Sequence, residues 1–366
     1  MSNRLLAGTR KGLFVFDVDG ERASLSATHF LGEPATAVLP VSDSQWYVVL
    51  GHGHFGAKLH YTDDAGASFR EMASPTYPPK PEGVEDLDPM RKQPIPWAVQ
   101  QIWILEAGGA AGELWCGTIP GGLFRSADGG ASWQLMDALW NQPARGKWFG
   151  GGYDYPGIHS VCVDPRDAAT VTVAISCGGV WRSTDRGMTW NSHGRGMRAA
   201  YMPPELAGDP EIQDPHRMVQ CPNSPEHFWV QHHNGIFRST NDAADWHGIE
   251  ATPSSFGFAV AVHPHNPDLA WFVPAQQDVC RVPVAGRFGV MRTRDGGNSF
   301  DLLADGLPDA PAYHLVYRHG LDVDAAGATL AMGSTTGSLW IGRDGGERWQ
   351  RVSAELPPIN TVRFCR

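Results

Sequence analysis

The segment Ser183-Thr184-Asp185-Arg186-Gly187-Met188-Thr189-Trp190 carries the pattern that decides the fold. A hydroxyl residue, an aspartate, a glycine and a second hydroxyl residue stand at alternate positions, and an aromatic residue follows directly. Three more copies are intact, at 62–69, 126–133 and 293–300, and two have lost part of the pattern, at 239–246 and 342–349. The aspartate positions lie 49 to 64 residues apart. The chain is therefore built from repeats of that length.

The chemistry of this pattern is structural. Serine, threonine and aspartate side chains bond to the backbone of a tight turn, and glycine adopts the positive φ that such a turn needs. The aromatic side chain is expected to be buried between neighbouring sheets. The pattern resembles the Asp-box, or BNR repeat, of β-propellers, and its copies cover nearly the whole chain.

A second periodic feature shows that there are seven repeats. A short β run, a glycine-containing turn and an apolar-rich strand precede most of the boxes, and the same feature occurs at 8–16, where no full box follows. Each repeat has four expected strands, A to D from innermost to outermost. In the fourth repeat, A is predicted over 159–163, B over 171–175 and C over 180–183, and D begins near Trp190.

These repeats predict an all-β, seven-bladed β-propeller of four-stranded blades, in one domain that spans residues 1–366. The first repeat has strands B, C and D but lacks strand A. Blade 1 is therefore predicted to consist of residues 4–30 plus 359–365, so that the C-terminal strand closes the ring. Such closure leaves no exposed sheet edge.

The composition excludes several classes of protein. The formal net charge is −10 and no run of Lys or Arg occurs, which argues against a nucleic-acid partner. No stretch approaches the roughly 18 apolar residues of a membrane-spanning helix. The six cysteines form no Cys-x-x-Cys pair, and the apolar run after Arg4 is too short for a signal peptide. We therefore expect reduced thiols and a cytoplasmic location.

Long connections indicate which face of the propeller carries function. D-to-A and B-to-C connections lie on one face of a blade, and the box turns lie on the other. Insertions mark the first face, roughly at 73–96, 137–158, 191–215 and 274–287. The residues predicted there are the carboxylates Asp154 and Asp214, as catalytic candidates, and Trp148, Tyr153, Arg198 and Gln276, as substrate-binding candidates.

Seven of the 15 histidines map to the same face. His159, His216 and His314 align at the start of the innermost strand in three repeats, and we treat them as candidate catalytic residues and metal ligands. The B-to-C turn of the second repeat adds His52 and His54 as further candidate metal ligands. The remaining substrate-binding candidates of this cluster are Arg217, His232 and His233.

Three hypotheses explain this cluster. The histidines could line a solvated channel mouth and bond to loop backbone. They could bind a divalent transition metal, because neutral imidazole is the commonest metal ligand. They could also act without metal, as acids or bases paired with a carboxylate such as Asp154 or Asp214. The sequence leaves all three open.

The resemblance implies a fold more firmly than an activity. Asp-box propellers include sialidases, xyloglucan-cleaving glucanases, sortilin-type receptors and photosystem II assembly factors, and this chain is most similar to bacterial single-domain "sialidase-like" or "BNR glycosyl hydrolase" proteins. The Arg-Ile-Pro motif of true sialidases is missing, since residues 8–12 read Gly-Thr-Arg-Lys-Gly. We therefore expect a hydrolase or lyase that acts on a small polar or sugar-like substrate. The alternative is a non-catalytic module that binds a protein or carbohydrate through the same face.

Overall fold

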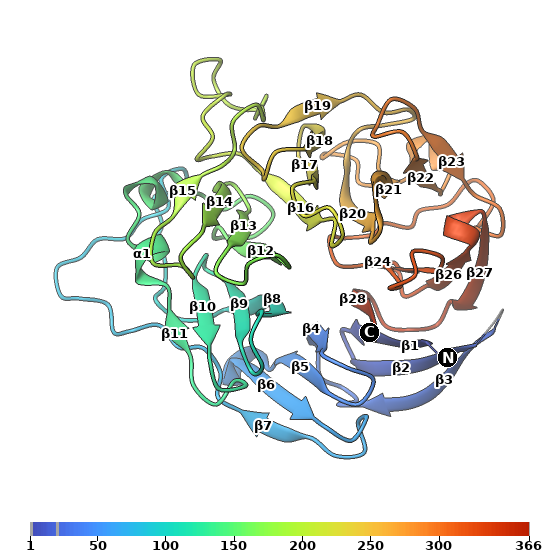
Figure 1. Cartoon of the computed structure of the whole chain (residues 1–366), viewed down its shortest axis with the longest axis horizontal. Coiled ribbons are helices and arrows are strands. Elements are labelled where there is room, and N and C mark those ends of the chain that lie inside the picture. The colour runs from blue at the N-terminus through green and yellow to red at the C-terminus, as the bar shows by residue number, and fades with distance from the viewer. Residues whose placement is uncertain (1–2, 20–21, 366) are drawn as a thin grey trace.

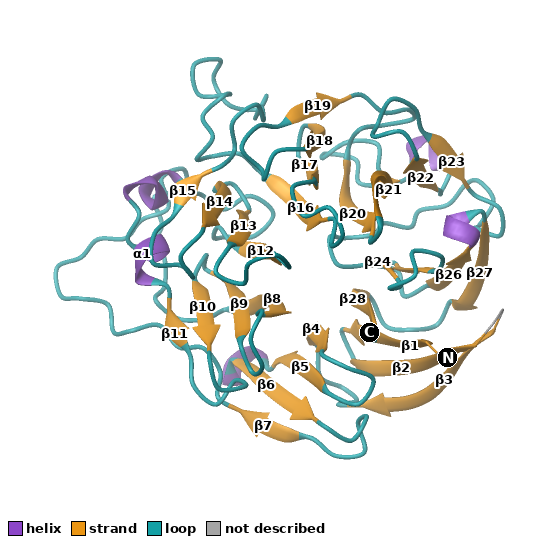
Figure 2. Cartoon of the chain, viewed as in Figure 1, coloured by secondary structure: helices purple, strands orange, loops and turns teal. Residues whose placement is uncertain are grey.

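The computed structural model describes residues 3–19 and 22–365, and these residues form seven four-stranded antiparallel sheets arranged in a ring (Figure 1). Short runs of β-branched and aromatic residues form the strands, and glycine-rich turns end them (Figure 2). This confirms the predicted seven-bladed β-propeller. No helix in the described part of the chain is long and apolar enough to cross a membrane.

Each blade is one sheet, whose strands run in order from the innermost to the outermost. Blade 1 contains β28 (Ile359–Phe364), β1 (Asn3–Thr9), β2 (Gly12–Asp19) and β3 (Arg22–His29). Blade 2 contains β4 (Ala35–Pro40), β5 (Trp46–Gly51), β6 (Ala57–Thr62) and β7 (Arg70–Met72). Blade 3 contains β8 (Gln101–Ala107), β9 (Leu114–Ile119), β10 (Leu123–Ser126) and β11 (Gln134–Leu135). Blade 4 contains β12 (Ile158–Val163), β13 (Val171–Ile175), β14 (Gly179–Ser183) and β15 (Asn191–Ser192).

The other three blades follow the same order. Blade 5 contains β16 (Pro215–Gln220), β17 (Phe228–His232), β18 (Gly235–Ser239) and β19 (His247–Ile249). Blade 6 contains β20 (Gly257–His263), β21 (Asn266–Pro274), β22 (Val290–Thr293) and β23 (Asp301–Leu303). Blade 7 contains β24 (Leu321–Val323), β25 (Leu330–Gly333), β26 (Leu339–Arg343) and β27 (Arg348–Ser353). The short helices are α1 (Asp137–Trp140), η1 (Gly53–Phe55), η2 (Pro143–Lys147), η3 (Val284–Gly286) and η4 (Asp344–Gly346).

The C-terminal strand closes the ring as predicted. β28 pairs with β1 in antiparallel register, with Leu5 opposite Phe364 and Ala7 opposite Val362. Arg363 extends this closure across the axis, because both of its terminal nitrogens lie 2.8 Å from the carboxylate of Glu106 in β8. The predicted first blade, residues 4–30 and 359–365, matches these strands, except that its turn at residues 20 and 21 lies outside the described residues.

The core lies between adjacent blades. One buried cluster joins blades 3 and 4, another joins blades 4 and 5, and the apolar contacts continue in this way around the ring. The largest fully buried side chains are tryptophans, among them Trp46, Trp115, Trp229, Trp271 and Trp340. The blades therefore stabilise one another by burial of apolar surface.

The repeated turns have the hydrogen bonds that their sequence predicts. In the turn after β10, the Ser126 hydroxyl donates to Asp128 Oδ1 at 2.8 Å, and the Ser132 hydroxyl donates to Asp128 Oδ2 at 2.6 Å. The Gly130 amide donates to the Ser126 hydroxyl. The hydrogen bonds from Ser132 lower the pKa of Asp128 to about 2. These aspartates bond within their own turns, so we assign them to the scaffold.

Trp190 provides a test of this scaffold. Its side chain is 4% exposed and packs in the cluster between blades 3 and 4. Trp190→Ala is expected to lower the free energy of unfolding by about 3–5 kcal/mol, because it removes a large buried aromatic side chain. Trp133→Ala is the matched control, since Trp133 stands at the same position of another turn but is only partly buried. Chemical denaturation measures both, and equal losses would contradict the packing described.

The closure of the ring provides a second test. Deletion of residues 359–366 exposes the edge of β1 and removes the buried side chains Ile359, Val362 and Phe364. We expect a larger fall in melting temperature than Trp190→Ala causes, because an entire strand and its apolar contacts are lost. Calorimetry measures this. A truncated protein that melts at the temperature of the full chain would overturn the assignment of β28 as the closing strand.

Candidate functional site

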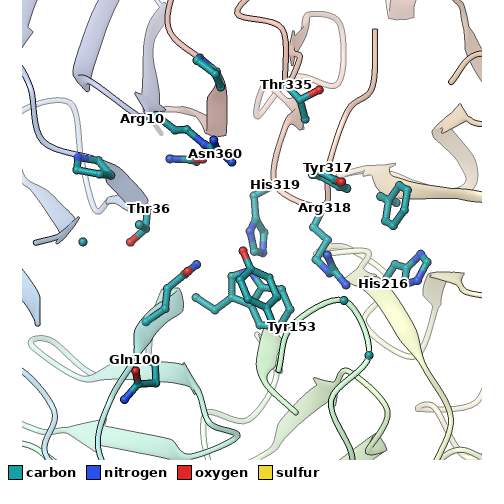
Figure 3. A pocket seen from close by; sticks show the side chains of 18 of the residues that line it. Arg10, Thr36, Gln100, Tyr153, His216, Tyr317, Arg318, His319, Thr335 and Asn360 are labelled. Carbon is teal, nitrogen blue, oxygen red and sulfur yellow. The ribbon is translucent and has the colours of Figure 1, made fainter. Parts of the chain in front are cut away.

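A cavity of about 1100 Å³ opens at the axis of the ring. It is lined by residues that precede innermost strands, such as Asp214 and Arg318, and by residues of turns between second and third strands, such as Arg10 and His233. The aspartates of the repeated turns do not line it. Figure 3 shows side chains from separate blades pointing toward one another in this cavity. The cavity therefore lies on the face opposite the repeated turns, where the long connections are.

Three side chains converge at one wall of the cavity. Asp214 Oδ2 lies 3.5 Å from His216 Nε2 and 3.5 Å from His233 Nδ1. One ligand atom from each residue lies within 4.8 Å of the others. Asp214 ends the connection before β16, His216 stands in β16, and His233 follows β17, so a single blade provides the whole group.

Hydrogen bonding fixes the ring of His216. Its Nδ1 lies 2.7 Å from the carbonyl oxygen of Gly257, which only accepts, so Nδ1 carries the proton. Burial lowers the pKa of His216, so the ring is neutral near pH 7 and Nε2 holds a lone pair. The ring of Phe258 stacks on it at 4.5 Å and holds its plane. His216 therefore presents a fixed lone pair to Asp214, and two acceptors face each other.

Asp214 is buried and ionised. Its side chain bonds to the Ser176 hydroxyl at 3.0 Å and to the Cys177 amide at 3.1 Å, both through Oδ1. Burial by itself would raise the pKa of Asp214, but its surroundings, among them the positive charge of Arg318, hold that pKa well below its usual range. The second oxygen, Oδ2, is left to face the two imidazoles. A cation bound between Asp214 and His216 would remove the repulsion between their lone pairs.

Four of the predicted site residues are brought together. Asp214, His216, His233 and Tyr153 all line the cavity. Tyr153 packs its ring against Trp103 at 4.9 Å. His232 does not line it, but its Nε2 accepts a hydrogen bond from the Asp214 amide, so it positions Asp214 instead of touching a ligand.

His159 and His314 do not belong to this group, which corrects the predicted metal set. His159 stands at the start of β12 as expected, but its Nε2 lies 2.7 Å from the Pro215 carbonyl oxygen and its Nδ1 lies 2.9 Å from the Ser160 hydroxyl. Neither nitrogen is free for a metal. His314 lies in the connection before β24, where Nδ1 contacts the Thr336 hydroxyl at 2.7 Å.

The remaining candidates also lie elsewhere. His52 pairs with Glu33 at 3.1 Å in a separate shallow hollow, and His54 is exposed. Trp148 is fully buried between blades, so it cannot stack on a ligand. Three further candidates are also absent from the cavity wall. Asp154 pairs with Arg91 at 2.6 Å, and Arg217 donates a hydrogen bond to the His159 carbonyl oxygen. Gln276 is exposed. Arg198 is likewise exposed and outside the cavity.

Among the cavity-lining residues that sequence reasoning missed are Cys177, Arg318 and His319. The error in the seventh repeat explains the last two, because Arg318 and His319, not His314, stand just before Gly320 and the innermost strand β24. His319 Nε2 donates to the His159 carbonyl oxygen across the axis at 2.8 Å. Alignment on the end of the connection, at Gly320, would have placed Arg318 and His319 at the cavity.

The comparisons with known proteins agree on the fold. No protein-family model matches the chain. A curated relative from Neosartorya fischeri, described as a probable oligoxyloglucan-reducing end-specific xyloglucanase, is 23% identical over 367 residues, which cover 92% of this chain and 41% of the relative. The GH74 xyloglucanase structure from Xanthomonas campestris superposes with a TM-score of 0.66 at 18% identity, over 95% of this chain and 52% of that one.

A third match is a structure described as YCF48 bound to D1 peptide, with a TM-score of 0.54 at 14% identity, over 87% of this chain and 83% of that one. The chain spans about half the length of the xyloglucanases or less. These likenesses define the class, a seven-bladed β-propeller with xyloglucanases among its structural neighbours.

Proposed function

We propose that this chain is an enzyme, a hydrolase or lyase, that acts on a small polar, sugar-like substrate in the axial cavity. We further propose that Asp214, His216 and His233 hold a divalent transition metal there. The observation that carries this proposal is the convergence of one carboxylate and two imidazoles at the wall of a cavity large enough for a small ligand.

The chemistry of the three groups suits such a metal. Two imidazoles and a carboxylate are typical ligands of Zn²⁺ and related ions. Ligands about 2.1 Å from a tetrahedral ion lie about 3.4 Å from one another. The two distances of 3.5 Å from Asp214 Oδ2 are close to that value. The Gly257 carbonyl, which fixes the His216 ring, matches the outer hydrogen bond that metal-bound histidines usually make.

The shape of the site supports a small substrate rather than a polymer. The three proposed metal-binding side chains lie at the wall of a cavity at the ring axis. The xyloglucanases that resemble this chain are about twice its length. A metal in this position would polarise a substrate oxygen or lower the pKa of a bound water. The residues of this chain would hold the ion, exclude bulk water and align the sugar against Trp103 and Tyr153.

The alternative is a propeller that binds a protein or carbohydrate without catalysis. A binding module is expected to present a shallow apolar platform. The buried Asp214 with two imidazoles at the wall of a cavity of about 1100 Å³ favours the enzyme instead.

Metal content tests the proposed ligand set. Protein purified after expression with added Zn²⁺ or Mn²⁺ is expected to hold about one equivalent by elemental analysis, and chelation is expected to lower its melting temperature. His216→Ala and His233→Ala should abolish both effects, because each removes a ligand. His314→Ala should retain both, since His314 lies outside the cavity. Sub-stoichiometric metal without a chelator effect would contradict the metal site. Acid–base chemistry by the carboxylate and the imidazoles without metal would then be the remaining mechanism.

Asp214→Asn tests the catalytic assignment. A screen of small glycosides and uronides should detect turnover, either as new reducing ends or as the ultraviolet absorbance of a new conjugated double bond. On any substrate turned over, Asp214→Asn should lower kcat/KM by about 100-fold, because it weakens metal binding and removes the buried charge. Asp154→Asn is the control, since Asp154 is exposed and paired with Arg91. A substrate that binds in the cavity without turnover would favour the binding module.

A further inference from the structure

Arg318 is a buried cation at the wall of the axial cavity. It precedes β24, is 7% exposed, and points into the cavity beside Tyr317 and His319 (Figure 3). Its guanidinium carbon lies 4.7 Å from the centre of the Trp103 ring and 5.9 Å from that of Phe258. The two aromatic rings hold the guanidinium in place and exclude water from it.

Arg318 lacks the partner that a buried charge needs. Its Nε has no hydrogen-bond partner, and no carboxylate lies within 4.0 Å of its nitrogens, in the part of the chain that the structure describes. Two other buried arginines are paired: Arg182 contacts Asp242 at 3.0 Å, and Arg292 contacts Glu347 at 2.7 Å. An unpaired buried charge is costly, so its retention at a cavity indicates a ligand that completes it.

The charge balance of the cavity points in the same direction. Arg281 is paired with Asp278 at 2.5 Å. The remaining charged side chains on the wall are Arg10, Lys11 and Arg318, against Asp214 alone. The wall therefore carries a local excess of positive charge, although the whole chain has a net charge of −10. Such local reversal favours entry of an anion.

We propose that Arg318 anchors a carboxylate group of the ligand in the axial cavity. The ligand class is a small sugar acid or hydroxy acid. The sugar-like part of this inference rests on the proposed function, whereas the anion site depends neither on turnover nor on metal.

A carboxylate fits the site better than a phosphate. The planar guanidinium, stacked on aromatic rings, leaves its edge free to donate two parallel hydrogen bonds to a carboxylate. Asp214 is buried at the same wall and close enough to attract Arg318. A phosphate dianion would place a second negative charge against Asp214, which costs more than the single charge of a carboxylate.

The backbone around Arg318 is shaped for close approach of a ligand. Gly151 and Gly152 line the cavity directly before Tyr153. A Cβ on Gly151 would meet Cys177 Sγ at 2.7 Å, and one on Gly152 would lie 3.7 Å from Arg318 Nη2. Gly152 therefore leaves space beside the guanidinium that a longer side chain would fill, whereas Gly151 leaves space beside Cys177 and Asp214.

Calorimetric titration with matched pairs of probes tests the proposal. Glucuronate, galacturonate and tartrate are each compared with their neutral amides, which have the same shape without the charge. The wild-type chain is expected to bind at least one acid about 10- to 100-fold more tightly than its amide, because the bidentate pair is charge-assisted. Glucose 6-phosphate is expected to bind more weakly than that acid.

Two variants separate the anchor from general effects. Arg318→Gln should bring the acid and its amide to equal affinity, while Arg198→Gln, an exposed arginine outside the cavity, should keep the preference. Arg318→Met retains the contacts with Trp103 and Phe258 and removes the charge, so it should melt no lower than the wild type yet lose the preference. Equal binding of every acid and amide by the wild type, or a preference that survives in Arg318→Met, would overturn the proposal. Both outcomes are independent of catalysis.

Discussion

The pairing of β28 with β1 is the constraint on which the rest of the structure depends. Each blade packs its apolar faces only against its two neighbours, so an open arc would leave an unpaired edge at one end and an uncovered face at each end. Closure brings residues that are far apart in sequence to one axis. His319 reaches the carbonyl of His159, and Arg363 reaches Glu106, across the centre of the ring. The cavity exists because the innermost strands of the seven blades approach the axis but leave a space there.

Convergence also explains why the axis holds buried charges. Seven strand ends surround a space that their side chains do not fill, and charged groups are among those that reach it. Asp214 is stabilised there by the hydrogen bonds that its Oδ1 accepts from the Ser176 hydroxyl and the Cys177 amide, and by the positive charge of Arg318. Arg318 has aromatic stacking but no hydrogen-bond partner at Nε in the described chain. The two charges therefore differ in their hydrogen bonding: the Asp214 carboxylate accepts hydrogen bonds from the protein at Oδ1, whereas the Nε of Arg318 donates none in the described chain.

The fold could be predicted from the sequence because its signal is local and repeated. Each turn such as 126–133 satisfies its own side chains, so a few residues determine the structure of their blade. The site could be predicted only in part. His216 and Asp214 stand at the end of a strand that the repeat fixes, whereas β24 is only three residues long and follows an irregular connection, so the period does not determine which histidine reaches the axis. His52 shows the second limit, since the sequence placed it on the correct face but not its distance from the axis.

The division between the two faces has a consequence for how such a protein acquires an activity. The repeated turns are tied to the packing of their blades, so a change at Trp190 affects stability first. The connections that build the cavity lie outside the paired strands, so their residues can change without loss of strand pairing. The structure from Xanthomonas campestris, at 18% identity, superposes on the same fold. The proposed activity therefore rests on the residues at the axis, Asp214, His216 and His233, rather than on the blades that carry them.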